Sequence, residues 1–503
     1  MSSSLNAPKA SLFVCSTVAS LGGFLFGFDT GVIAGALPYI RQDDMFPDDD
    51  PVYSSWIQGT IVSSTLIGGA LGSVVFGMAA DMYGRHRILV LTDGIFVLGG
   101  ILMCFAGSCL ELILGRFIVG LAIGASAVIV PVFISEHAPA HVRGEFVTMN
   151  TVYVTVGQLA AYIVNVVCSY VRGTWRVMLG LSIIPACIQA VGLVYIKPAH
   201  EKTSTAKRAW KSVLERPVWD QVKLGVGLQM LQQLAGINTV MYFLPLILES
   251  AGIVSIQTSL KLSMIPAGCN FLGTLVGKRT IDHHGRRRVL LISLFGVAVT
   301  LLGMSVAFTL SSRTSPLVDP AQGASTCPSS PTTCSACISS GCVFCMDSSY
   351  TDGSGICISK DEHEMFNATA LCASSLDKMD VTAFEHTCPT PFVYSASIFL
   401  LTCAYLLAFS PGLGPIPWII CSEIFRQDVR GFCMGIASFF NWMTNFIVCQ
   451  VFLTSVVVFG ANGTFFTIFL ITCVGMWWVF SNIPETKGKD FEEIQALFTQ
   501  DPE

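Results

Sequence analysis

Long apolar segments follow one another along almost the whole chain, and most of the polar loops between them are short. A helix needs about 20 mainly apolar residues to cross the hydrocarbon core of a bilayer. Backbone groups in hydrocarbon must be hydrogen-bonded within their own segment, so each apolar run is expected to form a helix. We predict twelve spans, at residues 11–38, 53–80, 88–108, 110–134, 145–170, 175–196, 221–248, 258–281, 288–310, 391–422, 431–457 and 463–484.

Charge supports a multi-pass membrane protein. Only 12% of the residues are charged, whereas about a quarter of an ordinary soluble domain is charged. Lys and Arg concentrate in the loops on the side of the two termini, which predicts that both termini are cytoplasmic. We expect the plasma membrane as the location. The spans contain no Ser/His/Asp set, phosphate-binding loop or metal-ligand spacing, so we expect neither an enzyme nor a cofactor, a metal or a nucleic-acid partner.

Two repeated motifs indicate a duplicated chain. An Asp-x-x-Gly-Arg stretch and a Glu followed by Arg-Gly each occur twice, and the second interval exceeds the first by about the length of a polar insert. Two homologous halves with a later insertion explain both intervals. The repeated residues are Asp81, Arg85, Glu136 and Arg143, then Asp282, Arg286, Glu423 and Arg430. We predict that they form a cytoplasmic latch between helix ends, because carboxylates there can bridge to arginines of neighbouring helices. The alternative is a solvated charged face.

The predicted organisation follows from the spans and the repeat. It consists of an N-terminal six-helix bundle (1–196), a short cytoplasmic linker (197–220), helices 7–9 of a C-terminal bundle (221–310), a Cys-rich extracellular domain (311–390), helices 10–12 (391–484) and a cytoplasmic tail (485–503).

The Cys-rich insert is predicted to be stapled by disulfides. Its eight cysteines are Cys327, Cys334, Cys337, Cys342, Cys345, Cys357, Cys372 and Cys388. An even number in an oxidising compartment implies four bridges, whose connectivity stays open. The alternative is a zinc site, which the short gap between the two central Cys-x-x-Cys pairs disfavours. Asn367 lies in a glycosylation sequon. The insert is either a contact surface for an extracellular partner or a stable, protease-resistant domain without a binding role.

Polar residues inside the seventh span are candidates for substrate binding. Gln232 and Gln233 precede Gly236, and Asn238 follows it. On one straight helix Gln232 and Asn238 would lie about 240° apart, so we predict a break near Gly236 that turns both amides toward one cavity. Amides donate and accept hydrogen bonds, as binding of a polyol requires. The alternative is hydrogen bonding between helices.

The other spans add amides and a second predicted break. The run from Pro411 to Trp418 cannot stay a regular helix, because it contains three prolines and two glycines. Trp418 would offer a flat face to the C–H side of a sugar ring. The remaining candidates in this group are Tyr242, Asn270, Pro415, Pro417, Asn441 and Asn445.

Two opposite charges lie in the first half of the spans. Asp29 and Arg116 are natural partners, and opening and closing of such a pair can couple protonation to conformational change. The alternative is a permanent structural ion pair. Asp93 and Glu111 are interpreted as interfacial residues near span ends.

Taken together, these residues make the chain resemble the sugar porters of the major facilitator superfamily over nearly all of its length outside the insert. The motifs that carry the resemblance are Gly84-Arg85, Pro131-Val-Phe-Ile-Ser-Glu136, Gln232-Gln233-Leu-Ala-Gly236-Ile-Asn238, Gly285-Arg286-Arg287, Gly414-Pro-Ile-Pro-Trp418 and Pro484-Glu485-Thr486-Lys487-Gly488. The resemblance implies substrate contacts at Gln232, Gln233, Asn238, Asn270, Trp418 and Asn441. It implies gating at Tyr242 and Asn445, near Pro415 and Pro417, and proton coupling at Asp29 and Arg116.

Within that family the chain looks most like the proton-coupled myo-inositol transporters. Three departures stand out: Thr151 replaces a hexose-contacting glutamine, Ser410 replaces a glutamate of glucose uniporters, and Lys197-Pro-Ala-His-Glu201 replaces a Pro-Glu-Ser-Pro-Arg motif. The family's helical bundle between the halves is expected to be largely missing. The predicted function is uptake of a small polyol, myo-inositol, with a proton. The alternatives are a facilitative hexose carrier and a non-transporting nutrient sensor.

Overall fold

The structure is a computed structural model. It describes residues 9–43, 45–46, 51–137, 143–171, 174–196, 216–253, 255–318, 332–340, 342–347, 355–359, 372, 381–384, 388, 390–426, 429–489 and 491–499.

The first part of the chain forms a bundle of long helices. These are α1 (Lys9–Ile40), α2 (Pro51–Tyr83), α3 (Arg85–Cys104), α4 (Cys109–His137), α5 (Arg143–Cys168), α6 (Thr174–Gly180) and α7 (Ile183–Val194). Helix α1 packs along α5, and α2 packs along α4. Gly27 and Gly157 permit the first contact, because a Cβ atom on either would overlap the backbone of the facing helix.

The second part repeats the arrangement with more interruptions. Its helices are α9 (Arg216–Leu234), α10 (Ile237–Tyr242), α11 (Leu244–Ser250), α12 (Ile256–His284), α13 (Arg286–Arg313), α16 (Phe392–Phe409), α17 (Ile416–Ile424), α18 (Arg430–Asn482) and α19 (Phe491–Thr499). The two parts meet where α2 packs against α18 and where α5 packs against α12.

Both predicted breaks are confirmed. Gly236 has φ 87° between α9 and α10, a left-handed conformation that glycine adopts at little cost. The chain bends again by 76° before α11. No helix is assigned between Phe409 and Ile416, where prolines and glycines are concentrated.

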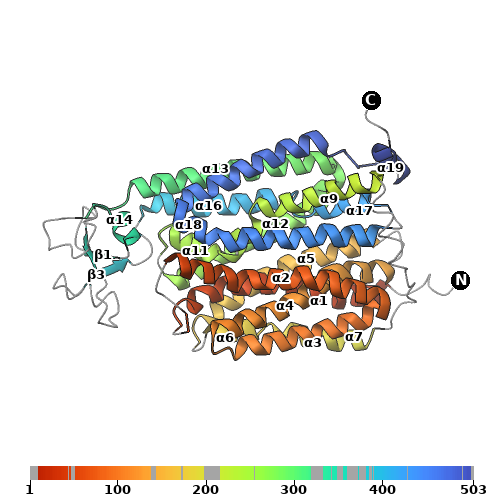
Figure 1. Ribbon diagram of the computed structural model, residues 1–503, viewed down its shortest axis with the longest axis horizontal. Helices are drawn as coiled ribbons and strands as arrows, with labels where there is room; N and C mark the ends of the chain where they lie inside the picture. Colours follow the sequence, from red (N-terminus) through yellow and green to blue (C-terminus); the bar gives the residue numbers. More distant parts are fainter. Residues whose placement is uncertain are drawn as a thin grey trace.

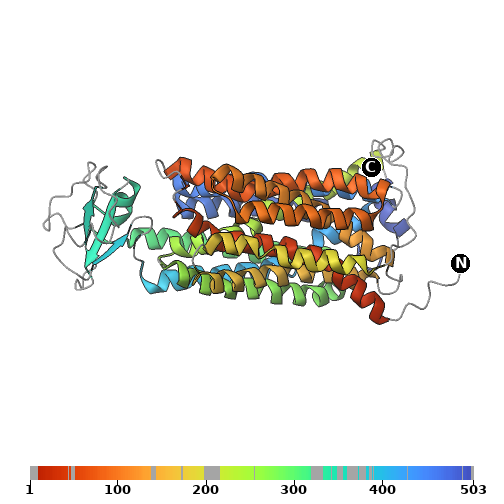
Figure 2. The same ribbon diagram turned by 90° about the horizontal axis from the view of Figure 1, so that it is seen from below.

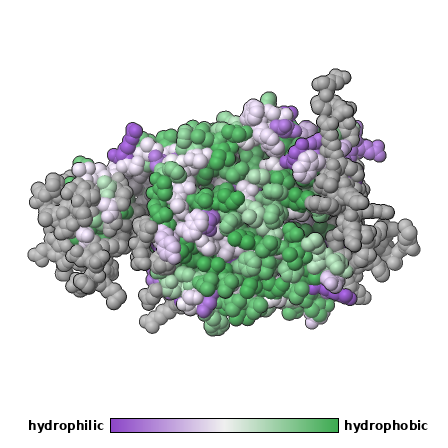
Figure 3. Space-filling view, viewed as in Figure 1, coloured by the Kyte–Doolittle hydropathy of each residue, from purple (hydrophilic) through white to green (hydrophobic). Residues whose placement is uncertain are grey.

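The helical membrane fold is confirmed, whereas the count of twelve spans stays a prediction. Within the described residues, nine helices are long and apolar enough to cross a membrane, or ten if the bent pair ending at Ser250 is one span. Helix α18 covers the eleventh and twelfth predicted spans, and Gly460, with non-helical φ and ψ, separates its two arms, which Figure 1 shows side by side. Figure 3 shows a mostly hydrophobic surface along the bundle, as a lipid-facing wall requires.

The two chain ends and the Cys-rich insert lie at opposite ends of the bundle (Figures 1 and 2). We call these the terminal end and the insert end. The insert contains α14 (Cys334–Ser339) and an antiparallel sheet of β1 (Val343–Asp347), β2 (Ile356–Ile358) and β3 (Val381–Phe384), with β1 in the centre.

The disulfide prediction for the insert is confirmed. The described bridges are Cys334–Cys388, Cys337–Cys357 and Cys345–Cys372, and Cys342 is also disulfide-bonded. The cysteines of the central Cys-x-x-Cys pairs therefore bond to different partners and do not share one site, which removes the zinc alternative. Cys327 and Asn367 lie outside the described residues.

Candidate functional site

Asp29 and Arg116 form a buried ion pair between α1 and α4. The Arg116 Nη1 and Nη2 atoms lie 3.2 Å from Asp29 Oδ1 and Oδ2, respectively. Arg116 Nε donates a third hydrogen bond, of 2.8 Å, to the Ile61 carbonyl on α2. The side chains are 3% and 0% exposed. A buried pair of this kind persists only with such geometry, because each ion alone would bear a large desolvation cost.

A connected set of amides lies between α9, α10 and α18. Asn441 Nδ2 lies 2.8 Å from Gln229 Oε1 and 2.9 Å from Gln232 Oε1. Its Oδ1 accepts a 3.0 Å hydrogen bond from Gln233 Nε2, and Gln233 Oε1 accepts one of 2.9 Å from Asn238. The break at Gly236 therefore brings amides from both sides of it into one network.

The second break supplies acceptors to the same network. Gln232 Nε2 donates to the carbonyls of Leu413 and Gly414, at 3.1 and 2.5 Å. Both carbonyls belong to the non-helical segment between α16 and α17, where helix hydrogen bonds no longer occupy them all. Trp418, which is half-buried, lies in the first turn of α17 just beyond this segment.

Asn270 on α12 joins the two parts of the chain. Its Nδ2 donates a 2.7 Å hydrogen bond to Gln158 Oε1 on α5, and its Oδ1 accepts one of 2.5 Å from Ser410. Ser410 occupies the first position after α16, so one amide links both bundles to the broken tenth span.

Helix α10 carries Asn238 of the amide network and packs against α1, which carries Asp29. The Tyr242 side chain at its end is buried. The Tyr162 hydroxyl on α5 donates to the Met241 carbonyl. Movement of α10 would therefore change the surroundings of the charge pair in the first bundle.

Contacts between the two parts also occur toward the insert end. Arg41 at the end of α1 forms an ion pair with Glu249 on α11, at 3.0 Å. Gln450 on α18 accepts a 2.6 Å hydrogen bond from Ser63 and donates one of 3.1 Å to the Thr60 hydroxyl. These contacts join the two parts of the chain toward the insert end.

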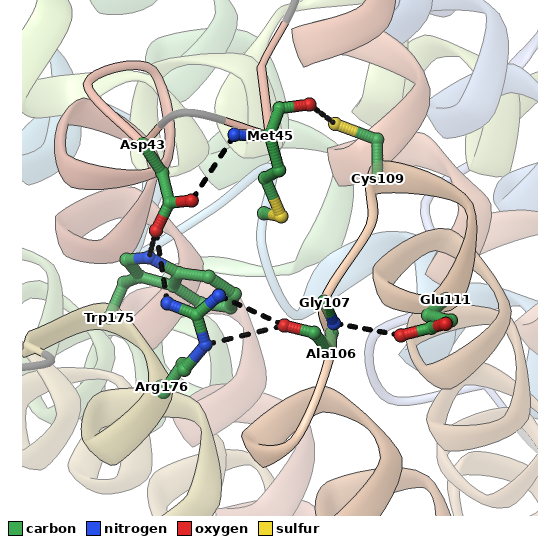
Figure 4. Close-up of polar contacts among 8 residues, drawn as sticks. All are labelled: Asp43, Met45, Ala106, Gly107, Cys109, Glu111, Trp175 and Arg176. Carbon is green, nitrogen blue, oxygen red and sulfur yellow. Dashed lines mark hydrogen bonds and ion pairs between the residues drawn. The ribbon is translucent and has the colours of Figure 1, made fainter.

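A polar cluster fixes the loops of the first bundle at the same end (Figure 4). Asp43 accepts hydrogen bonds from Trp175 Nε1 at 2.9 Å and from Arg176 Nη1 at 3.0 Å, while Arg176 also donates to the Ala106 carbonyl. Burial alone would raise the pKa of Asp43, but the hydrogen bonds from Trp175, Arg176 and the Met45 N–H outweigh it and hold the pKa below its usual range.

At the terminal end, the predicted latch is described for the second bundle. Arg286 Nη2 lies 3.1 Å from Glu423 Oε1, and Thr486 donates a 2.6 Å hydrogen bond to Glu423 Oε2. Glu485 accepts the backbone N–H groups of Arg286 and Arg287 at the start of α13. Burial opposes ionisation of Glu485, but its backbone donors lower the pKa below the ordinary value.

The other latch residues are only partly described. Arg430 donates to the Phe425 carbonyl at 3.3 Å, and Arg85 makes further interactions. The side chains outside the described set are Asp81, Glu136, Arg143 and Asp282.

Sequence reasoning missed several members of these networks. Gln158 and Ser410 both bond to the predicted binding residue Asn270, and the signal that could have identified them is a polar side chain inside an apolar span. The interpretation of Asp93 as interfacial is wrong. Asp93 is 2% exposed inside the first bundle, and its Oδ2 has no hydrogen-bond partner among the described residues. Its side of α3 faces packed helices, which hydropathy along the chain does not reveal.

The arrangement is suited to binding a small neutral molecule with many hydroxyls. Each amide offers both donors and acceptors, and a hydroxyl group could take the place of either partner in each hydrogen bond of the network. Among the described residues, no group of His, Cys, Asp and Glu side chains is arranged to hold a metal ion. The expected aqueous cavity at mid-bundle stays a prediction.

The known proteins to which this chain is similar are transporters. The model of the sugar (and other) transporter family matches residues 15–199, 193–327 and 379–498. The chain is 33% identical to probable inositol transporter 3 of Arabidopsis thaliana, over 95% of this chain and 91% of that protein. It is 31% identical to the human proton myo-inositol cotransporter, over 97% and 82% of the two chains. The inward-open structure of the xylose transporter from E. coli is similar, with a TM-score of 0.69, 22% identity and coverage of 97% and 99%.

Proposed function

The chain belongs to the sugar (and other) transporter family, and on that basis we propose that it carries a small polyol, myo-inositol, across the membrane together with a proton. Its relatives include inositol transporters of Arabidopsis thaliana and a human proton myo-inositol cotransporter. Transport occurs by alternating access, in which the two bundles expose a central site to each side in turn.

The observation that carries the proposal is the amide network centred on Asn441. A polyol entering between the bundles replaces amide-to-amide hydrogen bonds with amide-to-hydroxyl hydrogen bonds. The total number of hydrogen bonds therefore changes little. The binding residues are Gln232, Gln233, Asn238, Asn270, Trp418 and Asn441. Stereochemical selection comes from the spacing of donors and acceptors that α9, α10 and the carbonyls after Phe409 present together.

Asp29 carries the proton. In the ionised form it is held by Arg116; in the protonated form it loses most of that attraction and frees α1 to move relative to α4. Tyr242 lies at the end of α10, and it transmits substrate binding to the pair through that helix. Proton and polyol therefore favour the same rearrangement, which is the condition for coupling.

The rearrangement exchanges contacts at the two ends of the bundle. Residues 1–196 and 221–484, apart from the insert, act as the two moving bodies, with Tyr242, Pro415, Pro417 and Asn445 at the gates. Arg41–Glu249 and Gln450–Ser63 break when the insert end opens. The repeated carboxylates and arginines at the terminal end, among which Arg286 and Glu423 are already paired within the second bundle, then link the two bundles to each other. The protein resides in the plasma membrane with both termini cytoplasmic, and Asn367 is glycosylated outside.

Uptake in cells that lack their own inositol transporters tests the proposal. We expect saturable uptake of radiolabelled myo-inositol that rises as the external medium is acidified. Asp29→Asn removes the pH dependence of uptake. Asn441→Leu removes uptake in neutral and in acidified medium alike. Glu111→Gln, which changes an exposed carboxylate that bonds to neither the ion pair nor the amides, serves as the control. Uptake of glucose without pH dependence would instead identify a facilitative carrier, and binding without flux would identify a sensor.

A further inference from the structure

A cavity outside the transport site lies between α13 and α16. Its volume is about 410 Å³, within the range of roughly 300–1,000 Å³ that ligand pockets occupy. The lining is almost entirely aliphatic, with Tyr394 and Ser397 as the exceptions. The walls face outward, since Val306 is 49% exposed and Val393 is 68% exposed. Its surroundings are therefore the lipid and not the transport pathway.

The shape of the cavity follows from how the two helices pack. Near the middle of the bundle, glycines bring α13 and α16 together: a Cβ on Gly296 would lie 2.9 Å from Ala408, and one on Gly303 would lie 2.9 Å from Leu401. The cavity begins beside these contacts and continues along α13 as far as Leu310 and along α16 from Ser397 to Val393. From the cavity α13 leads toward the insert (Figure 1), and we call this cavity the wedge.

The length of the wedge matches one leaflet. Its lining on α13 runs from Val299 to Leu310, which is about 16 Å at the helical rise of 1.5 Å per residue. The hydrocarbon core of a bilayer is about 30 Å thick, so one leaflet contributes about 15 Å. An extended acyl chain would thus be covered along almost its whole depth.

Arg313 places a positive charge next to the end of the wedge that is nearer the insert. Val299, Val306 and Leu310 recur on one face of α13, and the next position of that face is Arg313, the basic residue of the last turn. Arg313 is exposed and lies about one turn beyond the apolar lining, at the level of lipid headgroups. Tyr394 on the facing helix has the interfacial position typical of tyrosine in membrane proteins.

We propose that this wedge binds one phospholipid, with an acyl chain between α13 and α16 and the headgroup phosphate against Arg313. The lipid fills the space below the insert and holds the two helices that carry it in a fixed relation. The site depends on apolar shape and on one charge, and it is independent of the amide network and of the transported substrate.

The test uses the purified full-length chain in detergent and native mass spectrometry. Dioleoyl phosphatidylglycerol is titrated against dioleoylglycerol, which has the same chains and no phosphate. We expect one tightly bound phosphatidylglycerol and binding of dioleoylglycerol weaker by about fivefold. Arg313→Gln should weaken phosphatidylglycerol binding by the same factor of about five, the usual effect of one basic residue at a membrane surface. Ala307→Phe should reduce binding to the level of nonspecific adducts, because it fills the wedge.

Two controls isolate the site. Arg288→Gln removes an exposed charge at the other end of α13, and Val191→Phe enlarges an exposed side chain on α7. Neither should change the affinity. Equal affinity for the two lipids, or equal binding by Arg313→Gln, Ala307→Phe and both controls, overturns the proposal. If Ala307→Phe does not fold, as judged by size-exclusion chromatography, the Arg313→Gln result decides alone.

Discussion

Neutralising one member of the Asp29–Arg116 pair should be much more harmful than neutralising both. Asp29→Asn leaves the Arg116 guanidinium buried with only the Ile61 carbonyl and a neutral amide as partners. Arg116→Gln leaves the Asp29 carboxylate buried without a counter-ion. Loss of one partner of a buried pair typically costs about 3–5 kcal/mol, because the remaining charge is not compensated.

The double variant Asp29→Asn/Arg116→Gln should recover most of that loss. Both side chains are then neutral, so no uncompensated charge stays buried, and we expect a cost below about 2 kcal/mol. The difference between the sum of the single effects and the double effect is the coupling energy of the pair, here about 4–8 kcal/mol.

Thermal unfolding of the purified protein in one detergent at pH 7 measures these effects. At roughly 2–4 °C per kcal/mol for a unit of about 200 residues, each single variant should lower the melting temperature by about 6–20 °C. The double variant should lie within a few degrees of the original protein. The reasoning is refuted if the single effects simply add, or if Asp29→Asn unfolds at the original temperature.

Three further expectations rest on other contacts. Asn441→Leu leaves Gln229, Gln232 and Gln233 without their shared partner, which should weaken myo-inositol binding by more than tenfold at about 1 kcal/mol per hydrogen bond; unchanged affinity in isothermal titration would contradict the binding role. Glu249→Gln removes an ion pair that joins the two parts of the chain toward the insert end, so an impermeant maleimide should label Gln450→Cys a few times faster in that background than in the parent; equal rates would show that the pair does not hold the gate. The low pKa of Asp43 means that its stabilising effect is present above the ordinary value of about 4 and is lost as pH falls through the folded-state value. The melting temperature of the original protein should therefore approach that of Asp43→Asn as pH falls from 6 to 3, and a constant difference would count against the cluster.

Much of the fold could be predicted from the sequence, because its determinants are local. A run of about 20 apolar residues must satisfy its backbone in hydrocarbon whatever surrounds it, so the helices lie close to the predicted segments. The breaks at Gly236 and after Phe409 follow from the backbone chemistry of glycine and proline. Disulfide bonding in the insert followed from the number of cysteines and from the side of the membrane assigned to them.

Pairing between distant side chains was decided only by the tertiary structure. Hydropathy does not give the rotation of one helix against another, and that rotation determines that Asn441 meets three glutamines and that Asn270 reaches Gln158 in the other bundle. The same limit explains the error at Asp93, whose burial depends on neighbouring helices. The sequence by itself determined which polar residues are costly to place in a membrane. The packing of the helices decided which of these residues hydrogen-bond to one another and so lower that cost.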